Sequence, residues 1–513
     1  MKPKSIIKGA FILTLAGIIT KIIGFFYRIY MSNVLGSEGM GLYQLIVPIY
    51  MLVWSISSSG ISTTISKLTA QENAFKRYGN INKILYHSII VSVFIASILS
   101  VTVYLYAEKI CIYFIKDMRA VLSLKLICFC FPFMAFGSCI RGWFFGFRET
   151  LTPAISQIFE QSIRMATIFF LSGILIPKGV EYAAAAAIMG MCLGEIASFV
   201  YVYLAHKYFK KSNNLFSKAT MGIRAVYSTI LAMAIPLTAN RMTGSLLSTI
   251  ENILIPQKLQ ESGLSQDMAM AMYGELFGMV MPLVMFPSSI LMALATTLLP
   301  AVSEASAAKN MKRILITLRK TMTFTSIIGI GACGAFITYP NEICELIYNR
   351  FELGEMLFFM GVASPFIYLQ VTFSGILNGL GEQVFIFKTS LLSSAINIGI
   401  IYFIVPKYGV YAFLFGWLTS LFIVSLICII RVVKRTGLTF DFSMWIFKPS
   451  FCIACGCVIS KVIYSKYLVQ MNKFIGMSFA LSIVGCFYLA FLIFIGCINL
   501  SVIKEMVGDI FRK

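Results

Sequence analysis

Long apolar runs recur from one end of this chain to the other, and they constrain its fold more than any other feature. A helix needs about 20 mostly apolar residues to cross about 30 Å of hydrocarbon, and the runs have that length. No water reaches that region, so the backbone must satisfy its hydrogen bonds within helices or a closed barrel. The runs are continuous rather than alternating with a period of two, which excludes a barrel. With 59% hydrophobic and 12% charged residues, the chain is predicted to be an all-α polytopic membrane protein.

About fourteen membrane helices are expected from these runs. The first follows Lys2, Lys4 and Lys8, as a signal peptide would, but no small-residue cleavage site ends it, so we interpret it as a retained helix. The expected helices lie near residues 8–33, 42–69, 84–107, 120–145, 152–176, 182–206, 224–255, 272–301, 314–339, 355–380, 384–405, 408–431, 446–466 and 474–497.

The basic residues indicate the orientation of these helices. The formal net charge is +21, and most Lys and Arg residues fall in alternate loops, as Lys76, Arg77, Lys210 and Lys211 do. Loops rich in Lys and Arg stay on the cytoplasmic side, so both termini are predicted to be cytoplasmic. The basic excess is therefore a topology signal, and we predict no nucleic-acid partner.

Residues in the first half of the chain recur in the second half at a nearly constant offset. The matched pairs are Pro132 with Pro365, Gly142 with Gly375, Gly146 with Gly379, and Glu149 with Glu382. An odd number of helices per copy gives two inverted seven-helix lobes, with a substrate site expected at their interface near mid-membrane. Similar apolar composition without a true repeat is the alternative. The expected divisions are an N-terminal lobe at 1–210, a cytoplasmic linker at 211–223, a second lobe at 224–440, and the last two helices with a cytoplasmic tail at 441–513.

Charged side chains inside the expected helices are the candidate site, because ionisable groups in a bilayer are costly and usually functional. In the first helix, Lys21 and Arg28 share a face with Thr14, Gly17 and Gly24 at spacings of three and four residues. Such a cationic stripe suits an anion, and the fork of arginine suits phosphate. The candidate substrate-binding residues are Lys21, Arg28, Lys67, Arg164 and Arg241.

Three acids are candidates for charge balance or for ion coupling: Glu160, Glu251 and Glu275. Structural roles compete with these assignments. Lys67 could extend to the cytoplasmic interface, and Glu160 could neutralise Arg164 four residues later. Arg141, Arg148 and Glu149 are interpreted as interfacial, and the glycines of the stripes could serve close helix packing.

Several functions are disfavoured by what the sequence lacks. There is no nucleotide-binding G-x-x-x-x-G-K-[ST] motif. Cys452, Cys455 and Cys457 imitate a metal-ligand spacing, but no second pair or nearby His completes it. We therefore predict no catalytic residue, metal or cofactor, and a transporter rather than an enzyme. Coupling to protons, sodium or the membrane potential remains open.

Short motifs carry a resemblance to a known family. They are Lys21–Arg28, Leu35–Leu45 and Ile255–Leu259, together with Ser59-Gly60-Ile61 and Leu298–Ala305. They resemble the stage V sporulation protein B family of the multidrug/oligosaccharidyl-lipid/polysaccharide (MOP) exporter superfamily. The resemblance implies a MATE-like fold of fourteen helices in two lobes in a bacterial plasma membrane, related to lipid II and polysaccharide flippases.

In lipid II flippases, arginines of the first helix face the lipid pyrophosphate. The resemblance places Lys21 on one such position and Arg28 at or one residue beyond another. Trp54 and Ser55 stand where those flippases carry an arginine in the second helix.

The leading hypothesis is an alternating-access flippase that moves an undecaprenyl-diphosphate-linked cell-wall precursor, lipid II for spore cortex peptidoglycan, to the outer leaflet. Its expected partners are this polyprenyl-diphosphate saccharide lipid, membrane lipids and cell-wall synthesis enzymes. The alternatives are a flippase for another polyprenyl-linked polysaccharide unit, a cation-coupled multidrug exporter and a scaffold of cell-wall assembly. A basic first helix would repel the cationic substrates of a drug exporter.

Overall fold

The computed structural model describes residues 4–308 and 310–497, and every regular element within them is a helix. The chain divides into two compact units. Unit 1 comprises Met1–Gly278 and Ile398–Val410, and unit 2 comprises Met279–Asn397 and Tyr411–Lys513. The predicted cytoplasmic tail after residue 497 lies outside the described residues. The lobe boundaries expected from the sequence stay a prediction.

Most of the helices are membrane helices by length and composition. Among the described residues, 11 helical segments are long and apolar enough to span a bilayer. A bent pair, α5 (Ala120–Cys128) and α6 (Phe131–Gly146), adds one more, with 47° between its halves. α9 (Ile223–Glu261) lies at the one remaining expected position, and α12 (Ser288–Ala307) lies in the second part of the span expected at 272–301. The predicted all-α polytopic fold is confirmed.

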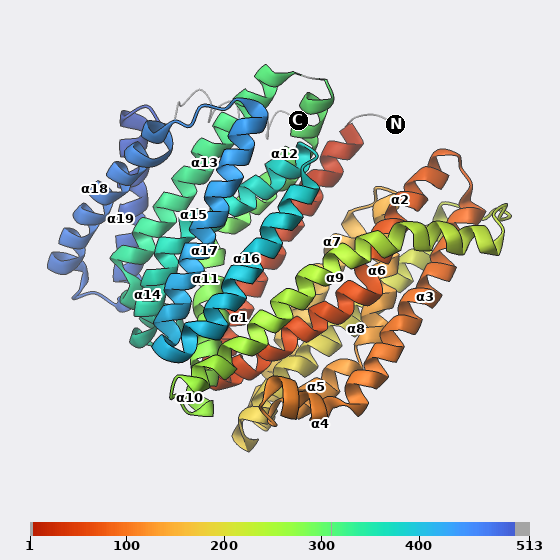
Figure 1. Ribbon diagram of the computed structural model, residues 1–513, viewed down its shortest axis with the longest axis horizontal. Helices are drawn as coiled ribbons and strands as arrows, with labels where there is room; N and C mark the ends of the chain where they lie inside the picture. The colour runs from red at the N-terminus through yellow and green to blue at the C-terminus, as the bar shows by residue number, and fades with distance from the viewer. Residues whose placement is uncertain (1–3, 309, 498–513) are drawn as a thin grey trace. The chain divides into compact units, whose positions relative to one another are not determined.

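Up to Gly278, unit 1 contains the first seven expected spans and the start of the eighth. In it, α7 packs against α8, α6 packs against α2 and α3, and α9 packs against α2 (Figure 1). Its further elements are α1 (Lys4–Trp54), η1 (Ser55–Ser59), α2 (Gly60–Ala74), α3 (Tyr78–Leu105), α4 (Ala107–Ile110), η2 (Cys111–Ile115), α7 (Leu151–Leu175), η3 (Ile176–Lys178), α8 (Val180–Ser212) and α10 (Gln266–Gly274).

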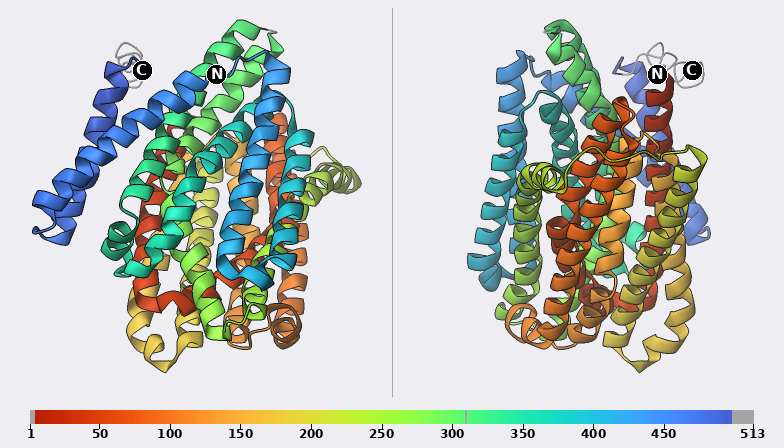
Figure 2. Two further views of the ribbon diagram at one scale, coloured as in Figure 1. Left: turned by 60° about the vertical axis from the view of Figure 1, so that its left-hand side comes forward. Right: turned by 90° about the vertical axis from the view of Figure 1, so that its right-hand side faces the viewer.

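Unit 2 is built from the remaining spans. α13 packs against α15 and α18, and α18 and α19 form a hairpin, drawn in blue in Figure 2. Its elements are α11 (Met281–Met285), α12, α13 (Met311–Thr338), α14 (Pro340–Tyr348), η5 (Phe351–Leu353), α15 (Gly354–Gly379), α16 (Gln383–Phe403), α17 (Val405–Thr436), η6 (Ser443–Phe447), α18 (Lys448–Ile463), η7 (Tyr464–Leu468) and α19 (Lys473–Phe494). The ends of α16 and α17 that meet at residues 398–410 belong to unit 1.

Two expected boundaries are wrong. The loop expected at 34–41 is helical except at Gly36, whose φ of 71° is accessible to glycine at no steric cost and kinks α1 there. The single helix expected at 272–301 is interrupted by the π-helical segment η4 (Glu275–Val280) and by a turn before α12. Apolar runs locate the membrane, but they do not show where a helix bends inside it.

α1 and α10 approach each other through glycines in unit 1. A Cβ added to Gly274 would lie 2.0 Å from the carbonyl oxygen of Ser37, and one added to Gly41 would lie 2.2 Å from that of Met270. Only a residue without a side chain permits backbones to come this close. The same glycines could not be recognised as packing residues from their spacing.

An arginine cluster holds the nearby ends of these two helices. Arg119 bonds to Glu38 of α1, to Asp267 of α10 at 2.9 Å and to Asp117 at 2.7 Å. The hydrogen bond to Asp117, with the other carboxylates, raises the pKa of Arg119 above its ordinary value. Arg119 therefore stays charged at every physiological pH and ties three chain segments together.

The two acids matched by the sequence repeat have different local partners. In unit 1, an oxygen of Glu149 accepts a bond from the backbone N–H of Leu151 at 3.1 Å, at the start of α7. In unit 2, Glu382 bonds to Arg431 at 2.6 Å and to Arg435, both on α17. The hydrogen bond from Arg431 holds the pKa of Glu382 below its ordinary value.

Each unit has its own buried core. In unit 1, Trp143 and Phe144 of α6 are fully buried among residues of α2, α3, α8 and α9. In unit 2, Phe373 of α15 and Trp445 of η6 lie in a cluster with residues of α13 and α17.

Candidate functional site

The cationic stripe expected on the first helix lies in the first part of α1, before the kink. Lys21 and Arg28 are both partly buried. A Cβ added to Gly17 or Gly24 would meet no atom within 4 Å, so these glycines keep the stripe open rather than pack a neighbouring helix. The side chain of Thr14 lies outside the described part of the chain.

A network of four buried charges joins α6, α7 and α8. Arg164 of α7 pairs with Glu160 one turn earlier and lies 3.6 Å from Glu195 of α8. Arg141 of α6 lies 3.9 Å from the other oxygen of Glu195. The hydroxyl of Tyr50 donates a 2.6 Å hydrogen bond to Glu195. Two positive and two negative charges offset each other here, as buried ions require.

Small residues of α8 make this network possible. Glu195 follows Gly194, where an added Cβ would lie 2.7 Å from Cγ of Arg164 and 2.9 Å from the carbonyl oxygen of Glu160. The absent side chain lets α7 approach α8 closely enough for the arginine to reach the acid. Glu195 is only 4% exposed, so its charge must be offset by these partners rather than by water.

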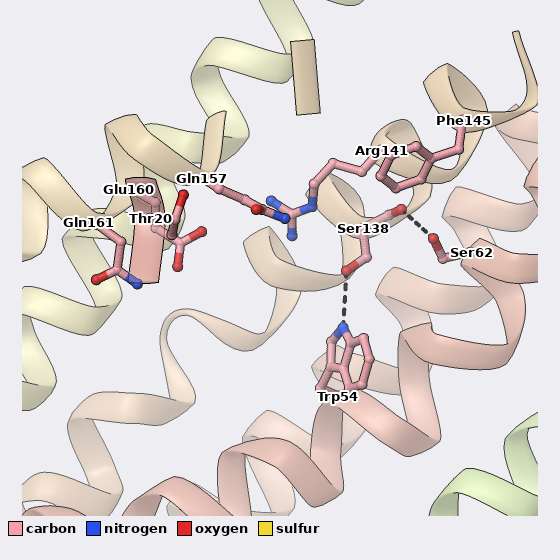
Figure 3. A pocket seen from close by; sticks show the side chains of 9 residues that line it. All are labelled: Thr20, Trp54, Ser62, Ser138, Arg141, Phe145, Gln157, Glu160 and Gln161. Atoms are coloured by element: carbon pink, nitrogen blue, oxygen red, sulfur yellow. Dashed lines mark hydrogen bonds between the residues drawn. The ribbon is translucent and has the colours of Figure 1, made fainter. Parts of the chain in front are cut away.

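A cavity of about 380 Å³ lies on one side of the network (Figure 3). The indole N–H of Trp54 donates to the hydroxyl of Ser138 at 3.2 Å, and the hydroxyl of Ser62 donates to the carbonyl oxygen of Ser138 at 2.8 Å. Seven of the nine lining residues carry polar or charged side chains, and the other two are Trp54 and Phe145. It consists of Thr20, Trp54, Ser62, Ser138, Arg141, Phe145, Gln157, Glu160 and Gln161.

The other predicted site residues lie outside this cavity lining. Lys67 of α2 is exposed and makes no ion pair with another described residue. Arg241 of α9 is also exposed, and its guanidinium donates a 3.1 Å hydrogen bond to the carbonyl oxygen of Ser59 at the end of η1. Glu251 and Glu275 are partly buried.

The environment of Arg141 differs from the sequence interpretation, which placed this residue at the membrane interface. The structure instead turns its guanidinium toward Glu195 and Ser198, whose hydroxyl it reaches at 3.1 Å, and into the cavity lining. Glu195 was missed altogether. An acid directly after the run of small and apolar residues 183–194, within an expected membrane helix, was a usable signal, because burying a charge in a bilayer is costly.

The described residues contain no group of three or more His, Cys, Asp or Glu side chains placed to hold a metal ion. What the site offers is a set of fixed hydrogen-bond donors and acceptors beside an open cationic helix face. This arrangement can bind and orient a polar ligand.

Comparison with known proteins identifies the family. Residues 6–306, more than half of the chain, match the model of a family described as polysaccharide biosynthesis protein. The chain belongs to this family. It is 26% identical to stage V sporulation protein B of Bacillus subtilis (strain 168) over 90% of both chains. It is 25% identical to the lipid II flippase MurJ of the same organism, over 74% of each.

Solved structures show the same fold. A structure of lipid II flippase MurJ in an inward closed conformation matches 96% of this chain and 99% of its own, with a TM-score of 0.67 and 16% identity. An inward-facing multidrug resistance MATE family transporter matches 83% of this chain and 98% of its own, with a TM-score of 0.65 and 15% identity. The chain is thus a multi-pass membrane protein of the polysaccharide biosynthesis protein family, with the fold seen in a transporter of the MOP superfamily.

Proposed function

We propose that this family member flips a polyprenyl-diphosphate-linked saccharide from the cytoplasmic to the outer leaflet by alternating access, with lipid II for spore cortex as the substrate. The names of its relatives support the lipid-linked class, since they include a stage V sporulation protein and a lipid II flippase. The finer choice of lipid II rests on those names alone.

The observation that carries the proposal is the open cationic face of α1. Arg28 makes no hydrogen bond or ion pair with another described residue, whereas Arg164 is paired twice. The buried hydroxyl of Tyr27, the residue before Arg28, has no hydrogen-bond partner among the described residues. Arg28 therefore serves as a ligand of the diphosphate, together with Lys21 on the same face of α1, and Arg164 serves as a structural cation of the network.

Transport direction and coupling complete the proposal. With both termini cytoplasmic, the substrate enters from the inner leaflet, where the lipid precursor would be made.

A ligand drives the exchange of two states only by binding them differently. Protons, sodium ions or the membrane potential would reset the substrate-free transporter, because each charge moved through 100 mV contributes about 2.3 kcal/mol. Glu160, Glu251 and Glu275 are the candidate carboxylates for such coupling, and cell-wall synthesis enzymes are the candidate protein partners.

A cation-coupled drug exporter is a weaker proposal for this chain. The only acid of α1 is Glu38, which lies beyond the kink at Gly36 and is bonded to Arg119. The part of α1 before the kink carries Lys21 and Arg28 and no acid. A cationic drug would meet repulsion there.

Reconstitution in liposomes tests the proposed function. Purified protein should move labelled lipid II between leaflets, and the double variant Lys21→Ala/Arg28→Ala should lose most of this movement because both diphosphate ligands are gone. Lys211→Ala, which removes an exposed cation at the end of α8, is the matched control and should retain the movement. Full activity of the folded double variant would refute the α1 site, and movement of no lipid by the parent protein would refute the flippase.

A further inference from the structure

The cavity beside the buried network is not built for the diphosphate. Its wall on α6 and α7 carries Arg141 and Glu160, and both belong to a network whose charges cancel. A phosphate placed there would meet the carboxylate of Glu160 and would find guanidinium groups already paired. The polar but neutral character of this wall calls for a ligand that is uncharged and rich in hydrogen-bonding groups.

Two glutamines of α7 supply the unused hydrogen-bonding capacity. Gln157 and Gln161 are four residues apart on one face of the helix, and both line the cavity. Neither amide bonds to another described residue. Each amide offers two donors and an acceptor, which matches hydroxyl and acetamido groups that also donate and accept. Figure 3 shows the Gln157 amide directed toward Arg141, with Gln161 on the side of Glu160.

The opposite wall is aromatic and held in place. The bond from Trp54 to Ser138 fixes the orientation of the indole, and Ser62 anchors the same turn of α6. Flat apolar surface combined with a few oriented polar groups is the usual composition of a small-molecule site, and about 380 Å³ falls within the usual range of about 300–1,000 Å³.

The cavity also adjoins the cationic stripe. Thr20 of α1 lines it, and the next residue along α1 is Lys21. A ligand whose neutral part enters the cavity would therefore place an attached anionic part beside α1. In a lipid-linked saccharide, the first sugar is joined directly to the diphosphate, which gives this order of groups.

We propose that this cavity binds a neutral sugar ring of the lipid-linked saccharide, and that Gln157 and Gln161 are the residues that recognise it. The proposal rests on the proposed flippase function and adds to it a division of labour: α1 holds the diphosphate, and α7 discriminates the glycan. A site built to bond hydroxyl groups disfavours a ligand that lacks them, because its own polar groups then stay unpaired. The bare carrier is such a ligand.

The experiment compares two lipids in the same liposomes, undecaprenyl diphosphate bearing the lipid II saccharide and bare undecaprenyl diphosphate. The parent protein should move the saccharide-bearing lipid faster. In Gln157→Ala/Gln161→Ala this rate should fall roughly tenfold, as expected for the loss of one or two hydrogen bonds, while the rate for the bare lipid stays unchanged. Ser162→Ala, an exposed hydroxyl on the same helix that bonds to its own backbone, is the control and should retain the preference.

The outcomes separate the two proposals. If the parent protein moves both lipids at one rate, or if the double variant keeps the parent's preference, the sugar site is refuted and the flippase stands. An equal loss for both lipids would indicate a structural role and also refute the sugar site. The single variant Gln157→Ala, at an exposed position, supplies the same readout if the double variant does not fold. Movement of neither lipid by the parent protein overturns both proposals.

Discussion

Glu195 is the residue on which the buried charges of unit 1 depend. It accepts a hydrogen bond from Tyr50 and lies within ion-pair distance of Arg141 and Arg164. The pair of Glu160 and Arg164 was weighed from the sequence because i, i+4 spacing is visible there. The contacts of Glu195 with α1, α6 and α7 were not, because nothing in a sequence shows which faces of separate helices meet.

Replacing Glu195 by glutamine should therefore destabilise the protein strongly. The variant leaves two arginines with one carboxylate in a buried setting, for which a loss of about 3–5 kcal/mol is expected. The measurement is the free energy of unfolding in detergent, with the thermal midpoint as a second readout.

Glu261→Gln is the matched control for that prediction. It removes an acid that is 45% exposed and paired with Lys258 at the end of α9, so a change below about 1 kcal/mol is expected. Equal effects of the two substitutions would show that Glu195 does not carry the network.

At the scale of elements, the positions of the helices followed from the sequence, whereas their internal breaks and contacts did not. Runs of apolar residues indicate which segments are surrounded by the hydrocarbon of the bilayer, so the spans were located within a few residues. The kink at Gly36 and the π-helical segment η4 depend on local backbone geometry. The glycines were equally ambiguous: Gly274 packs against backbone, while Gly17 and Gly244 face open space.

This difference predicts opposite responses to the same substitution. Gly274→Ala should lower stability by about 1–3 kcal/mol or more, because its Cβ would overlap the backbone of α1. Gly244→Ala on α9 should be neutral or should stabilise by up to about 1 kcal/mol through helix propensity. Thermal unfolding of the two purified variants checks this, and a tolerated Gly274→Ala would mean that α1 and α10 are not in backbone contact.

For the whole molecule, composition and the distribution of charge were enough to predict an all-α membrane fold, and the comparisons confirm this fold and show the family. The candidate site could be predicted from the sequence only in part. The sequence pointed to the cations of α1 but could not separate free charges from paired ones, and the functional assignments of Lys67, Arg241, Glu251 and Glu275 stay predictions.

The orientation in the membrane is also a prediction, and it can be tested on intact cells. Asn214 lies in the linker expected in the cytoplasm, and Tyr408 is an exposed residue expected outside. A membrane-impermeant maleimide should label Tyr408→Cys but not Asn214→Cys until the membrane is permeabilised. The parent chain, with its own cysteines, gives the background, and the reverse pattern would place both termini outside.

Unit 1 is formed by two segments that are far apart in the sequence, and this has a consequence for how the protein is synthesised. The segment 398–410 belongs to this unit, and the ammonium of Lys258 in α9 lies 4.1 Å from the ring of Tyr402 within it. A ribosome reaches this segment only after synthesising residues 279–397, which takes on the order of ten seconds at about 5–20 residues per second. Unit 1 must wait in the bilayer, incomplete, while much of unit 2 is inserted. A premature stop codon anywhere before residue 398 would therefore damage both units rather than remove only the later one.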